Sequence, residues 1–393
     1  MPSDGGPAAS ARDEVKTGAL GSRRAALVTH PIFRAPAFGN HHPLSTGRQA
    51  AVLDLIDALG WHERGAVFEP GLPDRGVLER FHDPAYLDAF ERAVTANLAS
   101  PEDRRDFNLG TMECPIFPGL WDRARATVGG SILAAQLAQG GYVVFHPGGG
   151  THHGRANRAS GFCYLNDPVF AIQTLLDAGT ERVVYVDFDA HHGDGVQDLL
   201  SEDERVTFIS VHEEGRWPGS GELGDRLSGR AFNIMVPRGL NDSEFEHLVD
   251  RVVLPVIDRQ KPGGMVMTLG ADALQGDPLS AMMLSNGALW RAAEACIART
   301  DRAVVLGGGG YNPWTTTRLW AGLWGRLCGN ELPNILPEQA RLILEGLECD
   351  LIDPDEREAR WLTTICDGPN PGPVRPVIAA IVRQLMPEEL WPC

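Results

Sequence analysis

Short, continuous runs of apolar and β-branched residues recur along this chain and alternate with stretches of helical pattern. An apolar run without alternation is typical of a strand buried on both faces of a sheet. Strands that alternate with helices predict an α/β fold with a mainly parallel central sheet flanked by helices. The expected strands are residues 25–29, 142–145, 183–187, 206–211, 232–236, 265–269 and 303–306. The expected helices are residues 49–59, 121–139, 168–178, 242–259 and 288–299, followed by 337–347 and 377–385.

The chain divides into a short tail and one large domain. Residues 1–23 are small, polar and aperiodic, which predicts a disordered N-terminal tail. Residues 24–393 show no repeat of solenoid period and are expected to form a single domain. No apolar run approaches the roughly 18 residues of a membrane span, and the N-terminus lacks the apolar core of a signal peptide.

The charge and the cysteines limit partners and location. The net charge of −17 argues against nucleic acid or an anionic membrane as a partner, because both are bound by basic patches. The seven cysteines are dispersed and form no CxxC pair. This pattern predicts reduced thiols in a cytoplasmic protein and offers no cysteine ligands for zinc.

Polar clusters follow five of the expected strands, at the point where each strand ends. In open α/β sheets, ligands bind outside the carboxyl ends of the strands. The five loops should therefore converge at one edge of the sheet. They read "HPGGGTHHG", "DFDAHHGDG", "SVHEEGRWPGSG", "GADALQGD" and "GGGGYN".

The second of these loops contains a candidate metal site. Residues two apart in an extended strand point the same way, so Asp187, Asp189 and His191 form one row. Asp189 and His191 could bind one ion together, with Asp272 as a third ligand from another loop. Two carboxylates and one imidazole leave room for water, as in catalytic metal sites, where the metal activates water and polarises a carbonyl. The alternative is that these groups only form salt bridges with each other.

Two histidines and a tyrosine could supply proton transfer and oxyanion binding. His152 and His153 are adjacent in a glycine-rich loop, where one could accept a proton from water and the other protonate a leaving group. Asp187 and Asp194 are available to orient them. Tyr311 follows four glycines, and its hydroxyl could donate to a developing oxyanion. The pair His41–His42 is interpreted as a surface pair without a catalytic role.

Taken in order, four motifs resemble the zinc-dependent histone deacetylase superfamily. They are "GGGTHHGRANRASGFCYLND", "VDFDAHHGDGV", "LGADALQGDPL" and "LGGGGYN". This group includes acetoin-utilisation proteins and acetylpolyamine amidohydrolases, and it shares the arginase-like α/β fold. The resemblance runs from about residue 28 to residue 326 and identifies residues 24–393 as a deacetylase-like domain.

The resemblance implies a role for each matching residue. The zinc ligands would be Asp189, His191 and Asp272. The tandem histidines would be His152, paired with Asp187, and His153, paired with Asp194, and Tyr311 would bind the scissile carbonyl and its oxyanion. The walls of an acyl-lysine tunnel would be Gly161, Phe162, Trp217 and Leu279, with Arg48 near an internal acetate channel. A structural potassium site would use Asp187, the backbone of Asp189 and His191, Ser210 and Val211.

Purely structural interpretations of the tunnel and channel residues stay open. In addition, three positions depart from the family pattern. Phe162 and Trp217 could be core aromatics, and Arg48 could lie on a helix surface. Glu113 in "TMECP" stands where many relatives have an aspartate that holds the substrate backbone. Leu279 replaces the glutamate gatekeeper of the polyamine-specific relatives, which counts against a polyamine substrate. Thr151 replaces a bulkier apolar residue, so the pocket floor is expected to differ.

The sequence therefore predicts a zinc-dependent amidohydrolase that removes acetyl or short acyl groups from lysine side chains or similar linear amines. Iron(II) could replace zinc with these ligands. Three alternatives stay open: a small-molecule deacylase acting on acetylated polyamines or other N-acyl metabolites, an arginase-like enzyme with two manganese ions, and a non-catalytic acyl-lysine binding protein. The sequence does not fix the oligomeric state, and a homo-oligomer is compatible with it.

Overall fold

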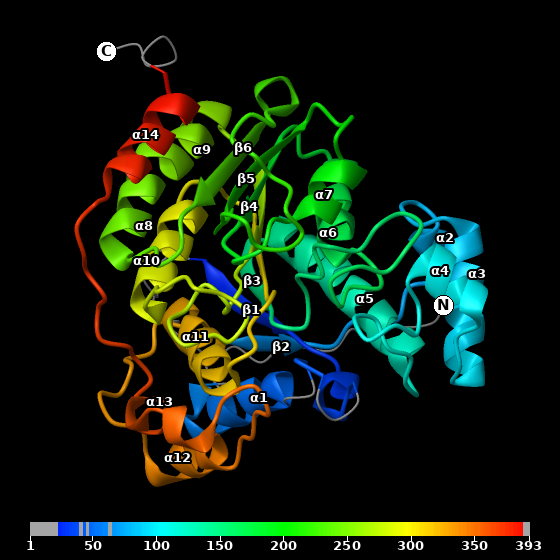
Figure 1. Cartoon of the computed structure of the whole chain (residues 1–393), viewed down its shortest axis with the longest axis horizontal. Coiled ribbons are helices and arrows are strands. Elements are labelled where there is room, and N and C mark those ends of the chain that lie inside the picture. The colour runs from blue at the N-terminus through cyan, green and yellow to red at the C-terminus, as the bar shows by residue number, and fades with distance from the viewer. Residues whose placement is uncertain (1–22, 39–41, 45–46, 62–64, 388–393) are drawn as a thin grey trace, which may run out of the picture.

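The computed structural model describes residues 23–38, 42–44, 47–61 and 65–387. Its centre is one eight-stranded sheet in the order β2-β1-β3-β8-β7-β4-β5-β6, and every strand pairing is parallel (Figure 1). All seven predicted strands are present to within two residues, which confirms the α/β class. The strands are β1 Arg24–Val28, β2 Ala66–Phe68, β3 Tyr142–His146, β4 Val183–Asp187, β5 Val206–Glu213, β6 Ala231–Val236, β7 Gly264–Thr268 and β8 Ala303–Leu306.

The predicted helices are also present, with one interruption. The expected helix over 242–259 contains a short π-helical segment, Val249–Val253, between α8 and α9. Pro255 explains it, because proline has no N–H to donate and its ring clashes with the preceding turn. The helices are α1 Arg48–Ala58, α2 Arg75–Leu78, α3 Pro84–Ala96, α4 Pro101–Phe107, α5 Leu120–Gln139, α6 Asp167–Asp177, α7 Asp194–Leu199, α8 Asp242–Leu248, α9 Leu254–Gln260, α10 Asn286–Ile297, α11 Pro313–Leu327, α12 Glu338–Glu345, α13 Ala359–Thr363 and α14 Pro376–Leu385.

Helices cover both faces of the sheet, so alternate residues of one strand enter different cores. In β4, Val184 and Val186 join the core under α1 and α8 to α11, whereas Val183 and Tyr185 join the core under α5 and α6. In Figure 1, α5, α6 and α7 lie to the right of the strands, and α8, α9 and α10 lie to the left. Burial on both faces is the reason that the strands read as continuous apolar runs.

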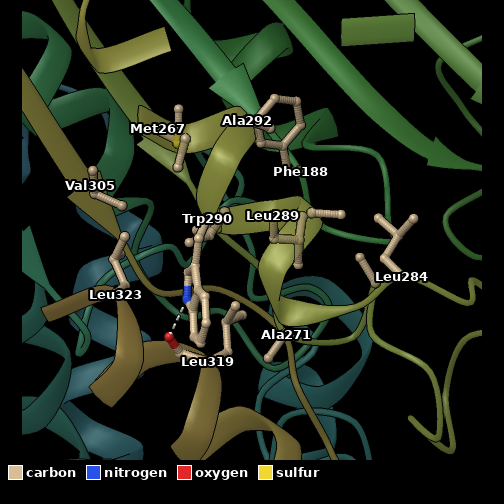
Figure 2. Close-up of a cluster of buried hydrophobic side chains, with 14 of the residues drawn as sticks. Phe188, Met267, Ala271, Leu284, Leu289, Trp290, Ala292, Val305, Leu319 and Leu323 are labelled. Atoms are coloured by element: carbon tan, nitrogen blue, oxygen red, sulfur yellow. Dashed lines mark hydrogen bonds between the residues drawn. The ribbon is translucent and has the colours of Figure 1, made fainter. Parts of the chain in front are cut away.

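Trp290 of α10 lies at the centre of the first of these cores. Figure 2 shows its indole ring surrounded by apolar side chains from α10, α11 and the sheet. The indole N–H donates to the carbonyl oxygen of Leu319 at 2.8 Å, so the polar atom of this buried ring is satisfied. This contact joins α10 to α11, the helix that directly follows the "GGGGYN" loop.

The C-terminal segment packs on the same body. The fully buried Arg318 of α11 donates to the carbonyl oxygen of Thr364 at 2.6 Å and forms an ion pair with Asp367 at 2.8 Å. The predicted tail lies outside the described residues except for Arg23, whose guanidinium donates to the carbonyl oxygen of Thr300 at 2.7 Å. Within the described ranges, the cysteines are free thiols and none of the helices is long and apolar enough to cross a bilayer.

Candidate active site

The polar loops that carry the candidate site residues follow strands that are neighbours in the sheet. β3, β8, β7, β4 and β5 are adjacent in that order, and because they are parallel, their carboxyl ends meet at one edge. Asp187 at the end of β4 stands in register with Thr268 of β7 and with Ser210 of β5. The order of the strands therefore explains how residues more than a hundred positions apart reach one site.

Asp189, His191 and Asp272 form a compact buried cluster. Each offers a ligand atom, and these atoms lie within 4.8 Å of one another. The His191 Nδ1 atom lies 3.2 Å from Asp189 Oδ1 and 2.9 Å from Asp272 Oδ2. Backbone amides orient the carboxylates, since Gly309 N–H donates to Asp189 at 2.6 Å and Ala190 N–H donates to Asp272 at 2.9 Å.

The charges in this cluster fit a divalent cation. Burial and the nearby Asp189 carboxylate raise the pKa of Asp272 to about 7. Burial alone would lower the pKa of His191, but its two carboxylate neighbours raise it to about 10. Two buried carboxylates facing one imidazole are costly without a further positive charge, and a metal ion supplies it.

The glycine run of the "GGGGYN" loop is needed for this close approach. A Cβ atom on Gly309 would lie only 2.1 Å from Asp272 Oδ2 and 2.8 Å from Asp189 Oδ2. Only glycine lets the backbone at this position approach both carboxylates. The loop can therefore deliver Tyr311, two residues further on, to the edge of the cluster.

The structure brings each of the tandem histidines to its expected carboxylate. His152 Nδ1 lies 2.7 Å from Asp187, and His153 Nδ1 lies 2.8 Å from Asp194. The two imidazole rings are 3.9 Å apart. The Tyr185 hydroxyl also donates to Asp187 at 2.7 Å, which fixes that carboxylate from a second side.

The two histidines have opposite protonation preferences. Burial opposes a charge on His152, but Asp187 and Asp189 together raise its pKa to about 9. Burial, and then the positive charge of His152, lower the pKa of His153 to about 3. His153 is therefore neutral, with Nδ1–H held by Asp194, and Nε2 keeps the lone pair that a general base needs.

Tyr311 is held through its backbone. Its N–H donates to Asp277 at 2.7 Å, while no hydrogen bond engages its hydroxyl among the described residues.

Arg48 donates to the carbonyl oxygen of Gly310 at 2.8 Å and lies over the ring of Trp320, so it faces the site rather than an outer helix surface. Sequence analysis missed Asp277, although the second aspartate of "GADALQGD" was a visible signal.

The expected tunnel residues flank the histidines. The Phe162 ring stands edge-on to Tyr311 at 5.9 Å, and the Trp217 ring stands edge-on to His153 at 4.6 Å. Trp217 is 45% exposed and Phe162 is half-buried, so neither is a core aromatic. Gly161 lies under Trp217, since a Cβ atom there would be 2.5 Å from the indole. Leu279 is half-buried, and its N–H donates to Asp277 at 2.9 Å.

Glu113, which stands where many relatives hold the substrate backbone, makes hydrogen bonds to two neighbouring segments. Its carboxylate accepts from the Gly161 N–H at 2.5 Å and from the Asn108 amide at 3.0 Å. It therefore fixes the loop that carries Phe162. The prediction that His42 lies on the surface is wrong, because its ring is buried, packs edge-on against Phe162 at 4.7 Å and stacks on Phe38 at 4.3 Å.

A cavity of about 350 Å³ adjoins the histidines. It is lined by Gly161, Phe162, both tandem histidines and Tyr311. It continues past Arg48 and Thr151 and reaches the exposed residues Arg34, Ala35 and Pro36. Two of the residues expected to hold potassium, Ser210 and Val211, lie in β5 next to Asp187 of β4. Ser210 is the register partner of Asp187, Val211 follows it, and the Ser210 hydroxyl lies 2.9 Å from His212 Nδ1.

The fold and the site together define a metal-dependent hydrolase of the arginase–deacetylase class. A sequence model described as the histone deacetylase domain matches residues 42–327. Histone deacetylase 6 of Arabidopsis thaliana is 33% identical over 347 residues, which covers 86% of this chain and 73% of that protein. The acetoin utilization protein AcuC of Bacillus subtilis is 31% identical over 331 residues, which covers 81% and 85%. The chain belongs to the histone deacetylase family.

Solved structures agree with this assignment. An HDAC homologue from Aquifex aeolicus matches with a TM-score of 0.88 at 28% identity, covering 92% of this chain and 100% of that one. An HDAC homologue solved in complex with SAHA matches with a TM-score of 0.87 at 28% identity, covering 92% and 99%. The chain is a deacetylase of the hydrolase class, and the buried Asp–His–Asp cluster is its candidate metal site.

Proposed function

We propose that the enzyme uses zinc to remove acetyl or short acyl groups from lysine side chains or similar linear amines. The observation that carries this proposal is the position of neutral His153 and of the free Tyr311 hydroxyl on one cavity beside the Asp–His–Asp cluster. A base, an oxyanion donor and a metal site at one place are the parts that amide hydrolysis needs. Iron(II) would be held by the same nitrogen and oxygen ligands.

Each residue has a defined part in the proposed reaction. Zinc, when bound, activates the water and polarises the substrate carbonyl. His153 accepts the proton of the attacking water at Nε2 and later returns it to the leaving amine. The Tyr311 hydroxyl donates to the oxyanion, and the positive charge on His152 also stabilises it.

The substrate is proposed from the walls of the site. Phe162 packs against Tyr311, and Trp217 packs against Gly161 and His153, so aromatic rings lie beside the catalytic residues and suit a linear alkyl chain such as that of lysine. Leu279 brings no carboxylate to the rim, and a free polyamine cation would need one. The homologue solved with SAHA supports a site that takes small acylated amines. A cytoplasmic location is proposed on the dispersed cysteines.

A structural potassium ion is proposed beside the dyad of His152 and Asp187. Its oxygen ligands would come from Asp187, the backbone of Asp189 and His191, Ser210 and Val211. The register of β4 and β5 supports this proposal, because it sets Ser210 against Asp187. Oxygen ligands suit such a cation.

The test of the proposed function is turnover of a matched amide panel by purified protein of known metal content. The panel contains acetyl-lysine peptides, acetylputrescine and acetylspermidine. We expect the highest kcat/KM on the lysine peptides. A preference for the free polyamines would overturn the lysine assignment, and no turnover with one metal equivalent would favour a binding protein.

A further inference from the structure

The cavity beside the active site is larger than an acetyl group requires. Its volume is about 350 Å³, and one water molecule takes only about 30 Å³ of liquid. The cavity runs from Tyr311 past Arg48 and Thr151 to Phe33, Arg123 and Thr127. We call the part lined by Phe33, Arg48, Arg123, Thr127 and Thr151 the inner chamber. An acyl chain that continues beyond the reacting carbonyl would enter it.

Small polar side chains leave the inner chamber open. The Thr151 hydroxyl turns away to donate to the Leu165 carbonyl oxygen at 2.6 Å. The Thr127 hydroxyl donates back into α5, to the carbonyl oxygen of Arg123 at 3.1 Å. Both threonines therefore present short side chains to the chamber, and neither reaches across it.

Two guanidinium groups lie in the chamber wall. Arg123 is fixed by donating to the carbonyl oxygens of Ile32 at 2.7 Å and Ala35 at 2.6 Å, and to the Gln49 side chain at 3.2 Å. Arg48, the residue before Gln49, donates to Gly310 at 2.8 Å. The two arginines are thus linked through the first turn of α1, and both are held in place before any ligand arrives.

The two guanidinium groups differ in their charged neighbours. Arg48 lies near the carboxylates of Asp272, Asp189 and Asp277, which favour its charge. No ion pair engages Arg123 within the described part of the chain, and its hydrogen-bond acceptors are carbonyl and amide oxygens. Burial lowers the pKa of Arg123 to about 10 and also lowers the pKa of Arg48. A largely buried cation without a counter-ion is unfavourable, so a carboxylate that reached Arg123 would be stabilised.

We propose that the inner chamber selects acyl groups that end in a carboxylate, such as succinyl or glutaryl, with Arg123 binding the terminal carboxylate. This inference rests on the proposed deacylase function and names its acyl class. The reaction balances as hydrolysis. Water adds to the amide carbon, the C–N bond breaks, the amine leaves with a proton, and the product is a free dicarboxylate. The chemistry needs no other reactant.

The experiment compares kcat/KM on three peptides that differ only in the acyl group of one lysine. Acetyl measures the basic reaction, butyryl measures chain length without charge, and succinyl adds the terminal carboxylate. We expect the wild-type protein to prefer succinyl to butyryl. The Arg123→Gln variant should lower the succinyl-to-butyryl ratio by about tenfold or more, as loss of a charged hydrogen bond predicts. Arg123→Lys should retain part of the preference.

Arg125→Gln is the matched control. Arg125 lies on the same helix, and its guanidinium also donates to a backbone carbonyl, that of Pro73 at 3.0 Å, but it does not line the cavity. This variant should leave all three rates and their ratios unchanged.

A second measurement needs no variant. Succinate should inhibit turnover of acetyl-lysine more strongly than butyrate does.

The outcomes separate the two proposals. Hydrolysis of acetyl-lysine with a preference for butyryl over succinyl would overturn the inference and leave the proposed function intact. The inference would also fail if Arg123→Gln slowed all three peptides equally, or if butyrate and succinate inhibited to the same degree. Absence of turnover on every peptide by metal-loaded protein would refute both.

Discussion

Removal of one oxygen atom, in Tyr311→Phe, tests the chemistry with little change to the structure. The Tyr311 backbone is held by Asp277 and its ring packs edge-on against Phe162, and neither contact uses the hydroxyl. The free energy of unfolding should therefore change by about 0.5 kcal/mol or less. The hydroxyl is proposed to donate only to the oxyanion, so its loss should lower kcat roughly 100-fold, equivalent to about 2.7 kcal/mol, with little change in KM.

The assay is steady-state hydrolysis of an acetyl-lysine peptide at matched metal content, with thermal unfolding followed in parallel. Tyr142→Phe is the control, because Tyr142 begins β3 at the opposite end of the strand from the site. This control should turn over substrate like the wild type. A Tyr311→Phe enzyme with wild-type kcat would remove the hydroxyl from the mechanism, whereas an equal fall in both variants would mean that the effect is not specific.

Three further predictions address the metal, the tunnel and pH. Asp272→Ala should lose bound metal and turnover together; metal analysis that finds a full equivalent in this variant would show that the ligand set is wrong. Gly161→Ala should lower kcat/KM at least tenfold, because the new Cβ would lie 2.5 Å from Trp217 and from His153 in a backbone of φ +54°; unchanged kinetics would mean that this wall is not rigid. Burial lowers the pKa of His82 from 6.5 to about 4, although its hydrogen bond to the Arg155 carbonyl oxygen opposes the shift. The unfolded chain then binds the proton more readily, so stability should fall by up to about 3 kcal/mol as pH drops from 6.5 towards 4. Denaturant unfolding across that range measures the fall, and His82→Gln should show a shallower pH dependence if His82 causes it.

The central sheet could be predicted because each inner strand is buried on both faces and reads as an unbroken apolar run. The short β2, Ala66–Phe68, pairs only with β1 at the edge of the sheet and has no such pattern.

Helix α11 could not be predicted from the sequence for a different reason. Its sequence "PWTTTRLWAGLWGRL" contains three threonines and two glycines, which are weak helix formers, and it is buried on nearly every side. Its stability comes from tertiary packing, which local propensity does not show.

Helix α3, Pro84–Ala96, could have been predicted. It begins after Asp83 with a proline in its first turn, has a clear apolar face, and ends at Asn97 in the left-handed conformation. These are the usual start and stop signals of a helix.

The metal and histidine residues could be placed from sequence because their spacing and strand-end positions determine where they lie. Contacts that depend on local turns could not. One example is Glu113, whose carboxylate oxygens bond to Gly161 and Asn108. Asp277 was unassigned, and it accepts from three backbone N–H groups around Tyr311, including that of Leu279. Such bonds depend on loop geometry, which residue types alone do not specify.

Zinc titration of the metal-free protein tests the central claim most directly. Zinc is added in increments while hydrolysis of an acyl-lysine peptide is measured. The account predicts no activity without metal, a linear rise, and a plateau at one equivalent per chain, with Asp272→Ala inactive throughout. Hydrolysis by the metal-free protein, or a plateau reached only at two equivalents, would contradict a reaction built on the single cluster of Asp189, His191 and Asp272.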